Sequence, residues 1–388
     1  MKDEWKIVKF GEIAREIRLT TQTPIEDGLE FYIGLEHLDP QSLRIQRKGI
    51  IAEDNPSFTR AFKAGQILFG KRRSYQKKAA VADFDGICSG DIIVMEAVPG
   101  KIIPGLLPFI IQSDMFFDWA IKTSSGSLSP RTKWNALAEF EFPLPPIERQ
   151  EEITEVFNKI QHTLYSVIKM QKISSLLLTS IISDHIGKIQ KAGACLMPLS
   201  SLGDWKGGGT PPKNNKNFWT GGSIPWVSPK DMSTGKLSST IDKITNNAIQ
   251  KSATNLLPAD SILFVTRSGI LRHTLPIAII DVPMTFNQDI KALSVKEHFN
   301  PYYIWIILQF YAPKILQDCS KVGTTVESID FNLLKKFELS IPERNLQDQI
   351  VEVWQNQMNL FNTLKQKEQF MKSISTQVFS EFLKGGVI

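Results

Sequence analysis

Basic side chains gather in two stretches of the 388-residue chain, and their pattern suits the binding of a polyanion. Residues 60–78 hold seven Lys and Arg and no acidic residue, and residues 205–236 hold five lysines against the single acid Asp231. One such run is usually a solvated face, but two in comparable places favour phosphate binding. The candidate residues are Lys71, Arg72, Arg73, Tyr75, Lys77 and Lys78 in the first half, and Lys213, Lys216, Lys230, Arg267 and Arg272 in the second.

Recognisable catalytic patterns are missing. The sequence has no P-loop, no Gly-x-Gly-x-x-Gly, no His-Glu-x-x-His and no Gly-x-Ser-x-Gly, and its five histidines lack zinc spacing. Asp281, Asp289 and Lys291 mimic a nuclease site, but the first half has Ile93 where the lysine would stand. Residues 300–303 resemble a methyltransferase loop, yet helix capping by Asn300 explains them better. We therefore predict no catalytic residue, no cofactor and no metal site.

The chain repeats itself with a shift of slightly under 200 residues. The matched segments include 64–72 with 259–267, 88–92 with 286–290, and 140–156 with 337–353. Several blocks in the same order predict two similar domains. Arg72 and Arg267 lie at matching positions in the two copies, so a structural role, binding carbonyl groups of their own domain, would explain them as well as phosphate contact does.

The first part of each copy predicts a mixed, mostly β globular domain with a few helices. Short apolar runs lie between turn residues, as in short strands; they are residues 66–69, 92–95, 261–265 and 277–281. Asp114–Lys122 and Pro301–Tyr311 are predicted helices, and each begins near an Asp or Asn that could cap it.

The second part of each copy predicts a long helix. After Pro145-Pro146 the chain runs to about Gly187 without Pro or Gly, and apolar residues recur with heptad spacing from Ile153. The same register begins at Ile350 in the second copy. Each helix could instead pack on its own domain, but the matched registers favour pairing with each other. Because a whole domain separates the two helices, we expect an antiparallel pair.

Together these elements predict an α+β fold. Two similar, mostly β globular domains are joined by two long antiparallel coiled-coil helices, as a pseudo-twofold internal repeat. The predicted boundaries are 1–146 for the first domain, 147–190 for the first helix, 191–342 for the second domain and 343–388 for the second helix.

Composition places the chain among ordinary globular proteins. It is 42% hydrophobic and 22% charged, with a formal net charge of +5 and three widely separated cysteines. No apolar run approaches the roughly 20 residues that span a bilayer, and residues 1–5 do not resemble the start of a secretory signal. We expect a soluble, cytoplasmic protein that does not contact membranes.

Several motifs resemble one known family, the specificity subunits of type I restriction-modification systems. The shared motifs are Ile-Leu-Phe-x-x-Arg at 67–72 and 262–267, Lys-Gly-Gly-Thr-Pro with one extra Gly at 206–211, Ile-Pro-Trp-Val-Ser-Pro-Lys-Asp-Met at 224–232, and Pro-x-Pro-Pro-Ile-Glu-x-Gln at 143–150. At the second helix entry, residues 342–345 depart from this last form, which leaves the start of that helix open.

The resemblance implies a DNA-recognition subunit without catalysis. Its two target-recognition domains would each read one half of a split sequence in double-stranded DNA, while the helices would act as a ruler and dock methyltransferase subunits, probably two. A restriction (translocase/endonuclease) subunit is a further implied partner. Exposed helix faces with Glu151, Glu152, Glu155 and Lys159, or Glu352, Gln355 and Asn356, are candidate rims for such partners.

Two other functions stay open from the residues alone. The first is a non-catalytic coiled-coil interaction scaffold with incidental basic patches, and the second is a self-sufficient methyltransferase. Further candidates for DNA contact are Ser129, Arg131 and Lys133, and Lys321 before Gly323-Thr324-Thr325.

Overall fold

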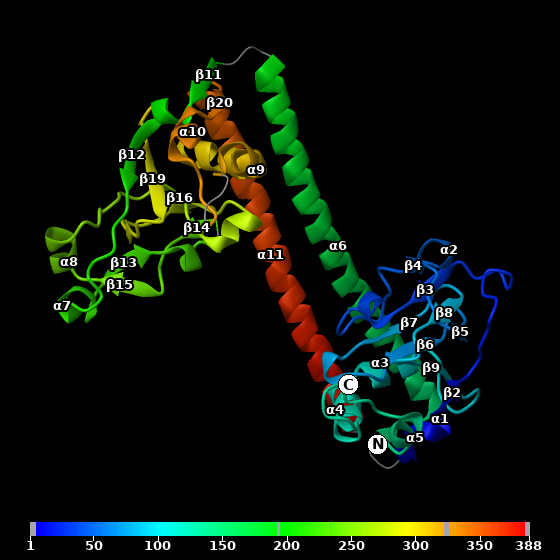
Figure 1. Ribbon diagram of the computed structural model, residues 1–388. Coiled ribbons are helices and arrows are strands. Elements are labelled where there is room, and N and C mark those ends of the chain that lie inside the picture. The colour runs from blue at the N-terminus through cyan, green and yellow to red at the C-terminus, as the bar shows by residue number, and fades with distance from the viewer. Residues whose placement is uncertain (1–4, 192–194, 234, 322–325, 385–388) are drawn as a thin grey trace. The chain divides into compact units, whose positions relative to one another are not determined.

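The chain forms two compact units in the computed structural model, which describes residues 5–191, 195–233, 235–321 and 326–384 (Figure 1). Unit 1 comprises Met1–Met170 with Leu364–Ile388, and unit 2 comprises Gln171–Thr363. The long helices are α6 (Ile147–Lys191) and α11 (Arg344–Leu383). Each of them therefore contributes one part to each unit.

Unit 1 contains two four-stranded sheets and a two-stranded one. The first has the order β2 (Ala14–Ile17), β9 (Ile92–Ala97), β6 (Ile67–Gly70), β7 (Ala79–Val81), and is antiparallel throughout. The second has the order β4 (Gly49–Ile50), β3 (Phe31–Ile33), β8 (Gly86–Cys88), β5 (Arg60–Phe62). Strand β1 (Lys6–Lys9) pairs with β10 (Glu141–Leu144). The helices are α1 (Phe10–Ile13), α2 (Ile51–Asp54), α3 (Leu107–Gln112), α4 (Asp114–Lys122) and α5 (Trp134–Ala138), with short 3₁₀ turns η1 (Leu35–His37) and η2 (Ser74–Gln76).

Unit 2 contains a five-, a three- and a two-stranded sheet. The first has the order β12 (Gly203–Gly207), β19 (Ile290–Val295), β16 (Ile262–Val265), β17 (Ile277–Ile280), β14 (Lys236–Leu237). The second has the order β15 (Asp242–Ile244), β13 (Ile224–Val227), β18 (Thr285–Phe286), and β11 (Cys195–Pro198) pairs with β20 (Glu338–Ile341). The helices are α7 (Lys216–Trp219), α8 (Asn246–Lys251), α9 (Pro301–Cys319) and α10 (Phe331–Lys336), with 3₁₀ turns η3 (Leu199–Ser201), η4 (Pro229–Asp231) and η5 (Gly269–Arg272).

The sequence repeat is also a repeat of topology. The order β2-β9-β6-β7 of unit 1 returns in unit 2 as β12-β19-β16-β17. The parallel pair β3–β8 returns as β13–β18, and the antiparallel pair β1–β10 returns as β11–β20. The predicted α+β class and internal repeat are therefore confirmed.

The local predictions are confirmed with two differences. Helix α9 starts at Pro301 as expected but runs eight residues beyond Tyr311, to Cys319. Apolar residues recur there on one face of the helix, since Ala312, Ile315 and Cys319 are buried in the core of unit 2. The hydroxyl of Ser113, rather than the carboxylate of Asp114, caps α4, since it accepts from the amide of Phe116.

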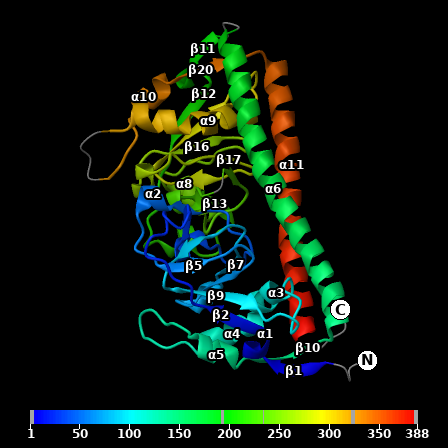
Figure 2. The same cartoon turned by 90° about the vertical axis from the view of Figure 1, so that its right-hand side faces the viewer.

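In unit 1, the beginning of α6 packs against the end of α11. The ring of Phe157 is fully buried, and its centroid lies 4.4 Å from that of Phe379 and 5.6 Å from that of Phe382. Helix α3 lies beside this part of the helix pair (Figure 2). Phe109 of α3 joins the cluster, with its ring centroid 5.2 Å from that of Phe157. The cluster therefore connects the helix pair to the globular part of the unit.

In unit 2, the end of α6 lies beside the beginning of α11. The hydroxyl of Ser174 donates to Oε1 of Gln357 across the seam at 3.2 Å. In both units, later residues of α6 meet earlier residues of α11, so the predicted antiparallel pairing is confirmed. The alternative of packing on the own domain holds in part, because Trp354 also contacts Trp305 of α9, with ring centroids 5.0 Å apart.

A search of the described helices for a segment both long and apolar enough to cross a bilayer finds none.

We predict that Phe157→Ala lowers the stability of unit 1 by about 3–5 kcal/mol, because it leaves a cavity among three aromatic rings. The neighbouring side chain of Val156 is 40% exposed, so Val156→Ala serves as the control and should cost under about 0.5 kcal/mol. Differential scanning calorimetry of the two variants makes the comparison. Equal unfolding midpoints would contradict the packing of Phe157 in the seam.

Candidate nucleic-acid interface

The first basic stretch forms a loop that leaves the buried strand β6. This loop, residues 71–78, contains η2, and Arg73 and Lys77 on either side of η2 have left-handed backbone conformations, with φ of 55° and 51°. Non-glycine residues adopt this conformation at a cost, so the surrounding contacts must hold the loop in shape. Contacts with the rest of the unit therefore determine the conformation of this loop.

The predicted residues of this loop differ in how free they are. Arg73 and Tyr75 are exposed, and the structure shows no hydrogen bond or ion pair from either side chain to any described residue. Lys77 pairs with Asp114 at 2.5 Å, and Nζ of Lys78 donates to the carbonyl of Leu35 at 2.6 Å. The loop thus offers two unoccupied side chains and two that are already engaged.

Lys71 lies deeper in the same loop and is half-buried. Burial lowers the pKa of its ammonium group, and the neighbouring charge of Arg60 lowers the pKa further. Its amide donates to the carbonyl of Asp91 at 2.9 Å. Lys71 therefore helps to attach the loop to the domain.

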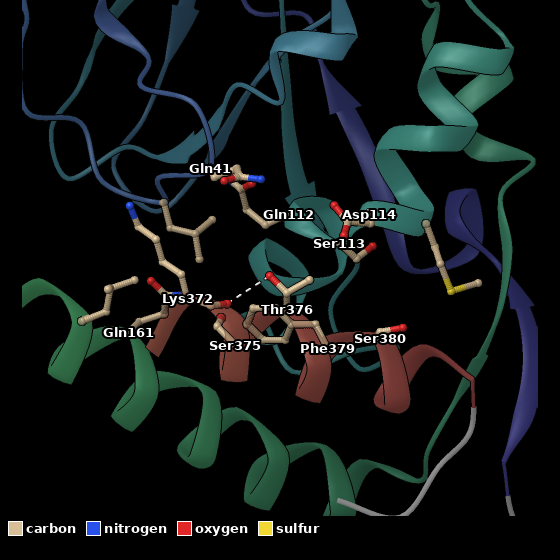
Figure 3. A pocket seen from close by; sticks show the side chains of 13 residues that line it. Gln41, Gln112, Ser113, Asp114, Gln161, Lys372, Ser375, Thr376, Phe379 and Ser380 are labelled. Atoms are coloured by element: carbon tan, nitrogen blue, oxygen red, sulfur yellow. Dashed lines mark hydrogen bonds between the residues drawn. The ribbon is translucent and has the colours of Figure 1, made fainter. Parts of the chain in front are cut away.

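Asp114 also lines a polar pocket of unit 1 (Figure 3). Side chains from the α3–α4 junction, including Gln112, face Lys372 and Thr376 of α11 there. The Oε1 atom of Gln112 is buried and has no hydrogen-bond partner among the described residues. Through Lys77 and Asp114, the end of the basic loop is fastened close to the helix pair.

Arg72 binds a carboxylate of its own domain instead of the carbonyls that we considered. Its Nη1 donates to Oδ2 of Asp91 at 3.3 Å, and its Nη2 donates to the hydroxyl of Ser129 at 3.1 Å. Arg131 donates to the other carboxylate oxygen of Asp91 at 2.8 Å. Burial raises the pKa of Asp91, but the hydrogen bonds and charges of Arg131 and Arg72 outweigh burial and hold that pKa below its ordinary 3.8.

The second domain repeats this arrangement at Arg267. Its Nε donates to Oδ1 of Asp289 at 2.6 Å. Arg272, at the end of η5, pairs with Glu327 at 2.5 Å. Both predicted arginines thus have acidic partners while their side chains stay more than half exposed.

The predicted lysines of unit 2 come earlier in the chain than Arg267, in and around α7 and η4. Lys213 and Lys216 are exposed, and the described structure shows no ion pair for either. Lys230 pairs with Asp242 at 2.8 Å, and the hydrogen bond to this carboxylate raises the pKa of Lys230. Lys213 and Lys216 are therefore the cations of this group that remain available.

The glycine-rich segment before them serves packing inside the domain. A Cβ atom on Gly208 would lie 2.0 Å from the carbonyl oxygen of Asn287. The amide of Gly209 donates to the carbonyl of Phe286, and its carbonyl accepts from Nε1 of Trp226 at 3.1 Å. Gly208 must therefore lack a side chain so that the chain can pass close to Asn287, which follows strand β18.

Sequence reasoning missed the acidic partners Asp91, Asp289 and Glu327. Asp91 and Asp289 occupy matching places in the repeated segments 88–92 and 286–290, so the repeat itself carried a usable signal. Glu327 has no counterpart of this kind.

Of the further candidates for DNA contact, some make internal contacts and others are exposed. Ser129 and Arg131 join the first basic loop, while Lys133 and Lys321 are exposed. Gly323-Thr324-Thr325 lies outside the described residues.

The apparent catalytic fragments have structural partners. Oδ1 of Asn300 accepts from the amides of Tyr302 and Tyr303, so it caps α9 as expected. Asp289 is engaged by Arg267, and Asp281 pairs with Lys236 at 3.1 Å. Within the described ranges, no three His, Cys, Asp or Glu side chains gather in a way that could hold a metal ion.

Comparison with known proteins agrees with this arrangement. Residues 196–370 match the family model of the type I restriction modification DNA specificity domain. A stretch of 166 residues, 43% of the chain, is 44% identical to 40% of the EcoR124I/EcoR124II specificity subunit of Escherichia coli. Over these parts, the chain is similar to type I restriction enzyme specificity subunits. It spans about two fifths of the length of this relative.

Two other similar proteins have lower sequence identity to this chain. The MjaIX specificity subunit of Methanocaldococcus jannaschii is 26% identical over 201 residues, 51% of this chain and 45% of that one. The crystal structure of the S subunit from M. genitalium covers 98% of this chain and 95% of its own, with a TM-score of 0.61 at 11% identity. At this identity the likeness shows the shared fold alone, and it confirms the predicted fold class.

We predict that the Asp91 pair makes stability depend on acid pH. Because the folded pKa of Asp91 is lowered, its contribution is fully present above the ordinary 3.8 and is lost as pH falls through the lower folded value. Asp91→Asn lacks this contribution, so its stability should fall less than that of the unsubstituted chain between about pH 5 and pH 2. Thermal unfolding measured across this range tests the prediction, with Asp204→Asn, an exposed acid, as the control. Parallel curves for the Asp91 variant and the unsubstituted chain would contradict it.

Proposed function

We propose that this chain is the DNA sequence-recognition subunit of a type I restriction-modification complex and that it performs no catalysis itself. The observation that carries the proposal is the duplication of one recognition module. The strand order β2-β9-β6-β7 of unit 1 returns as β12-β19-β16-β17 in unit 2, and each unit has an Arg–Asp pair at the matching place. Two similar binding modules on one chain suit a DNA target that has two separate halves.

Affinity and specificity come from different side chains in this proposal. Lys and Arg bind phosphates regardless of sequence, while a few side chains read base edges, with Arg and Lys favouring guanine. The exposed side chains of Arg73, Tyr75, Lys213 and Lys216 are the first candidates for DNA contact. Lys71, Arg72, Lys77, Lys78, Lys230, Arg267 and Arg272 remain candidates, although each must keep or exchange the internal contacts described above.

The helix pair supplies a fixed spacer in the proposed complex. Helix α6 has 45 residues, which corresponds to about 68 Å at 1.5 Å per residue. Half-sites one DNA turn apart are separated by about 34–36 Å. A pair of helices of this length is stiff enough to fix a separation of that order, so the spacing of the two half-sites would follow from helix length.

The helix pair also offers a surface for partner subunits. In a coiled coil, positions flanking the apolar seam are usually charged. In unit 2, one flanking position of the heptad holds exposed apolar side chains instead, with Leu177 on α6 being 46% exposed and Val353 and Leu360 on α11 being 37% and 42% exposed. Exposed apolar patches mark interaction sites. We infer that methyltransferase subunits, two in number, dock on this surface and that a restriction subunit completes the complex.

The charged helix residues considered as rims are partly occupied within the helix. Glu155 pairs with Lys159 at 2.6 Å, and the hydrogen bond and charge of Lys159 lower the pKa of Glu155. Such exposed pairs contribute little energy. The apolar positions are therefore better candidates for the main contacts, with the charged ones at the edge.

We predict that exchange of residues 191–342 for the corresponding segment of another specificity subunit changes one half of the DNA target and leaves the other half unchanged. Methylome sequencing of cells that carry either chain reads both halves directly. A change in both halves, or in neither, would contradict the modular function.

The scaffold alternative predicts a different response to salt. When several phosphates are contacted, DNA affinity falls by orders of magnitude between about 50 and 200 mM salt. A flat response of the complex over this range would favour a scaffold with incidental basic patches. Binding of S-adenosylmethionine by the chain alone, measured by calorimetry, would instead support a self-sufficient methyltransferase.

We predict that Leu177→Asp weakens binding of the methyltransferase subunits at least tenfold, because the carboxylate must lose water in an apolar contact. Thr179→Asp introduces the same charge at an exposed position of the same helix turn and should change binding little. Size-exclusion titration of each variant with purified methyltransferase subunit measures the difference. Equal binding by the two variants would exclude this face as the docking surface.

A further inference from the structure

Asp91 lies where three segments of unit 1 meet. It lies in the turn between β8 and β9, directly before β9, and its carbonyl accepts from the amide of Lys71 at 2.9 Å, at the start of the basic loop. Its carboxylate accepts from Arg72 of the same loop and from Arg131. Arg131 closes a hairpin, since it exchanges backbone hydrogen bonds of 2.9 and 3.0 Å with Ser125. One acidic residue thus joins the basic loop to the hairpin.

The loop and the hairpin are also aligned along their backbones. The amide of Arg73 donates to the carbonyl of Pro130 at 2.8 Å, and the amide of Thr132 donates to the carbonyl of Lys71 at 3.0 Å. At the hairpin tip, Leu128 is 91% exposed. The two segments therefore form a single surface on which Arg73, Tyr75 and Leu128 face solvent.

Unit 2 repeats these contacts around Asp289. Its carbonyl accepts from the amide of Thr266 at 2.8 Å, and its carboxylate accepts from Arg267. The amide of Ser268 donates to the carbonyl of Glu327 at 3.1 Å, and the amide of Ile329 donates to the carbonyl of Thr266 at 2.8 Å. These bonds correspond one by one to those in unit 1. In place of a second arginine on the aspartate, the Arg272–Glu327 pair joins η5 to the segment 327–329.

The charges explain why the aspartate matters more than a single surface ion pair would. The Asp91 side chain is only 20% exposed and the Asp289 side chain only 19%. Water therefore screens these pairs less than a fully exposed pair. Without the Asp91 carboxylate, Arg72 and Arg131 would be neighbouring positive charges with no counter-charge, and their repulsion would push the basic loop and the hairpin apart.

We propose that Asp91 and Asp289 are positioning residues for DNA recognition. Asp91 holds the basic loop against the hairpin that Arg131 closes, and Asp289 holds residues 266–268 against residues 327–329, each in the arrangement that reads one half of the target. This inference rests on the proposed DNA-recognition function. The aspartates do not contact DNA in it, because their carboxylates are engaged by arginines and would repel phosphates. They set the geometry of side chains such as Arg73, and base reading needs that geometry within a fraction of an ångström.

The test uses Asp91→Asn and Asp289→Asn in the complete complex with its methyltransferase and restriction subunits. Both halves of the target are first defined from the methylome of cells with the unsubstituted chain. Methylation is then measured on duplexes in which one half at a time is altered. We expect Asp91→Asn to lower discrimination in one half about tenfold and Asp289→Asn to lower it in the other half, so each variant is a control for the other.

Two further measurements separate positioning from a general loss of folding. Binding to an unrelated duplex at low salt should be unchanged or slightly stronger in Asp91→Asn, because the variant carries one negative charge fewer. Asp91→Glu should restore part of the discrimination. Glu139→Gln, which removes an equal charge from the exposed Lys9–Glu139 pair of the same unit, should leave discrimination unchanged.

A double variant protects the test if Asp91→Asn lowers stability. Where the aspartate acts through Arg131, adding Arg131→Gln to Asp91→Asn should cause no further loss of discrimination, whereas independent roles would add. Equal loss in both halves, loss in neither, or additive losses would overturn the inference and leave the proposed function intact. An unsubstituted complex that binds all duplexes equally would instead overturn the proposed function.

Discussion

The two long helices each carry one narrow apolar seam, and a single helix of this kind cannot remove its seam from water. The structure depends on how this constraint is met. The beginning of α6 covers the end of α11 through Phe157, Phe379 and Phe382, and the end of α6 meets the beginning of α11 at Ser174 and Gln357. Each compact unit therefore contains a part of both helices. Removal of either helix would expose apolar surface in both units, so the helix pair and the globular parts are stabilised together.

The same constraint gives the duplicated domain its use in our proposal. Two copies of a binding module on separate flexible chains would read two short sequences without fixing the distance between them. In our proposal the helix pair fixes that distance, because within each unit the apolar seams of α6 and α11 cover each other. Its mixed seam, with Ser174 and Gln357 among apolar residues, also specifies one register, since a shifted pairing would leave these polar groups opposite apolar side chains.

The protein itself uses many of its basic side chains in internal contacts. Most of the basic residues that the sequence offers for DNA are engaged by the protein: Arg72 and Arg267 by repeated aspartates, Arg272 by Glu327, Lys77 by Asp114, Lys78 by a carbonyl group and Lys230 by Asp242. These contacts shape loops and hold their side chains in defined places. Arg73, Lys213 and Lys216 remain exposed without an ion pair among the described residues, and in our proposal they are the cations that DNA would meet first.

The sequence by itself determined the repeat, the positions of four strands, the starts of α4 and α9, and the antiparallel helix pair, because these follow from periodicity and capping along the chain. Heptad spacing fixes which face of a helix must be covered, and the matched registers identify what covers it. Even the boundary at Asp114–Lys122 could be predicted from local capping. Only the tertiary structure decided which basic residues are free. An ion pair such as Arg72 with Asp91, or Arg272 with Glu327, joins residues that are 19 and 55 positions apart, and its formation depends on where strands end in space. From composition and charge runs alone, these arginines are predicted to be available for DNA. In the folded protein, each of them is paired with a carboxylate.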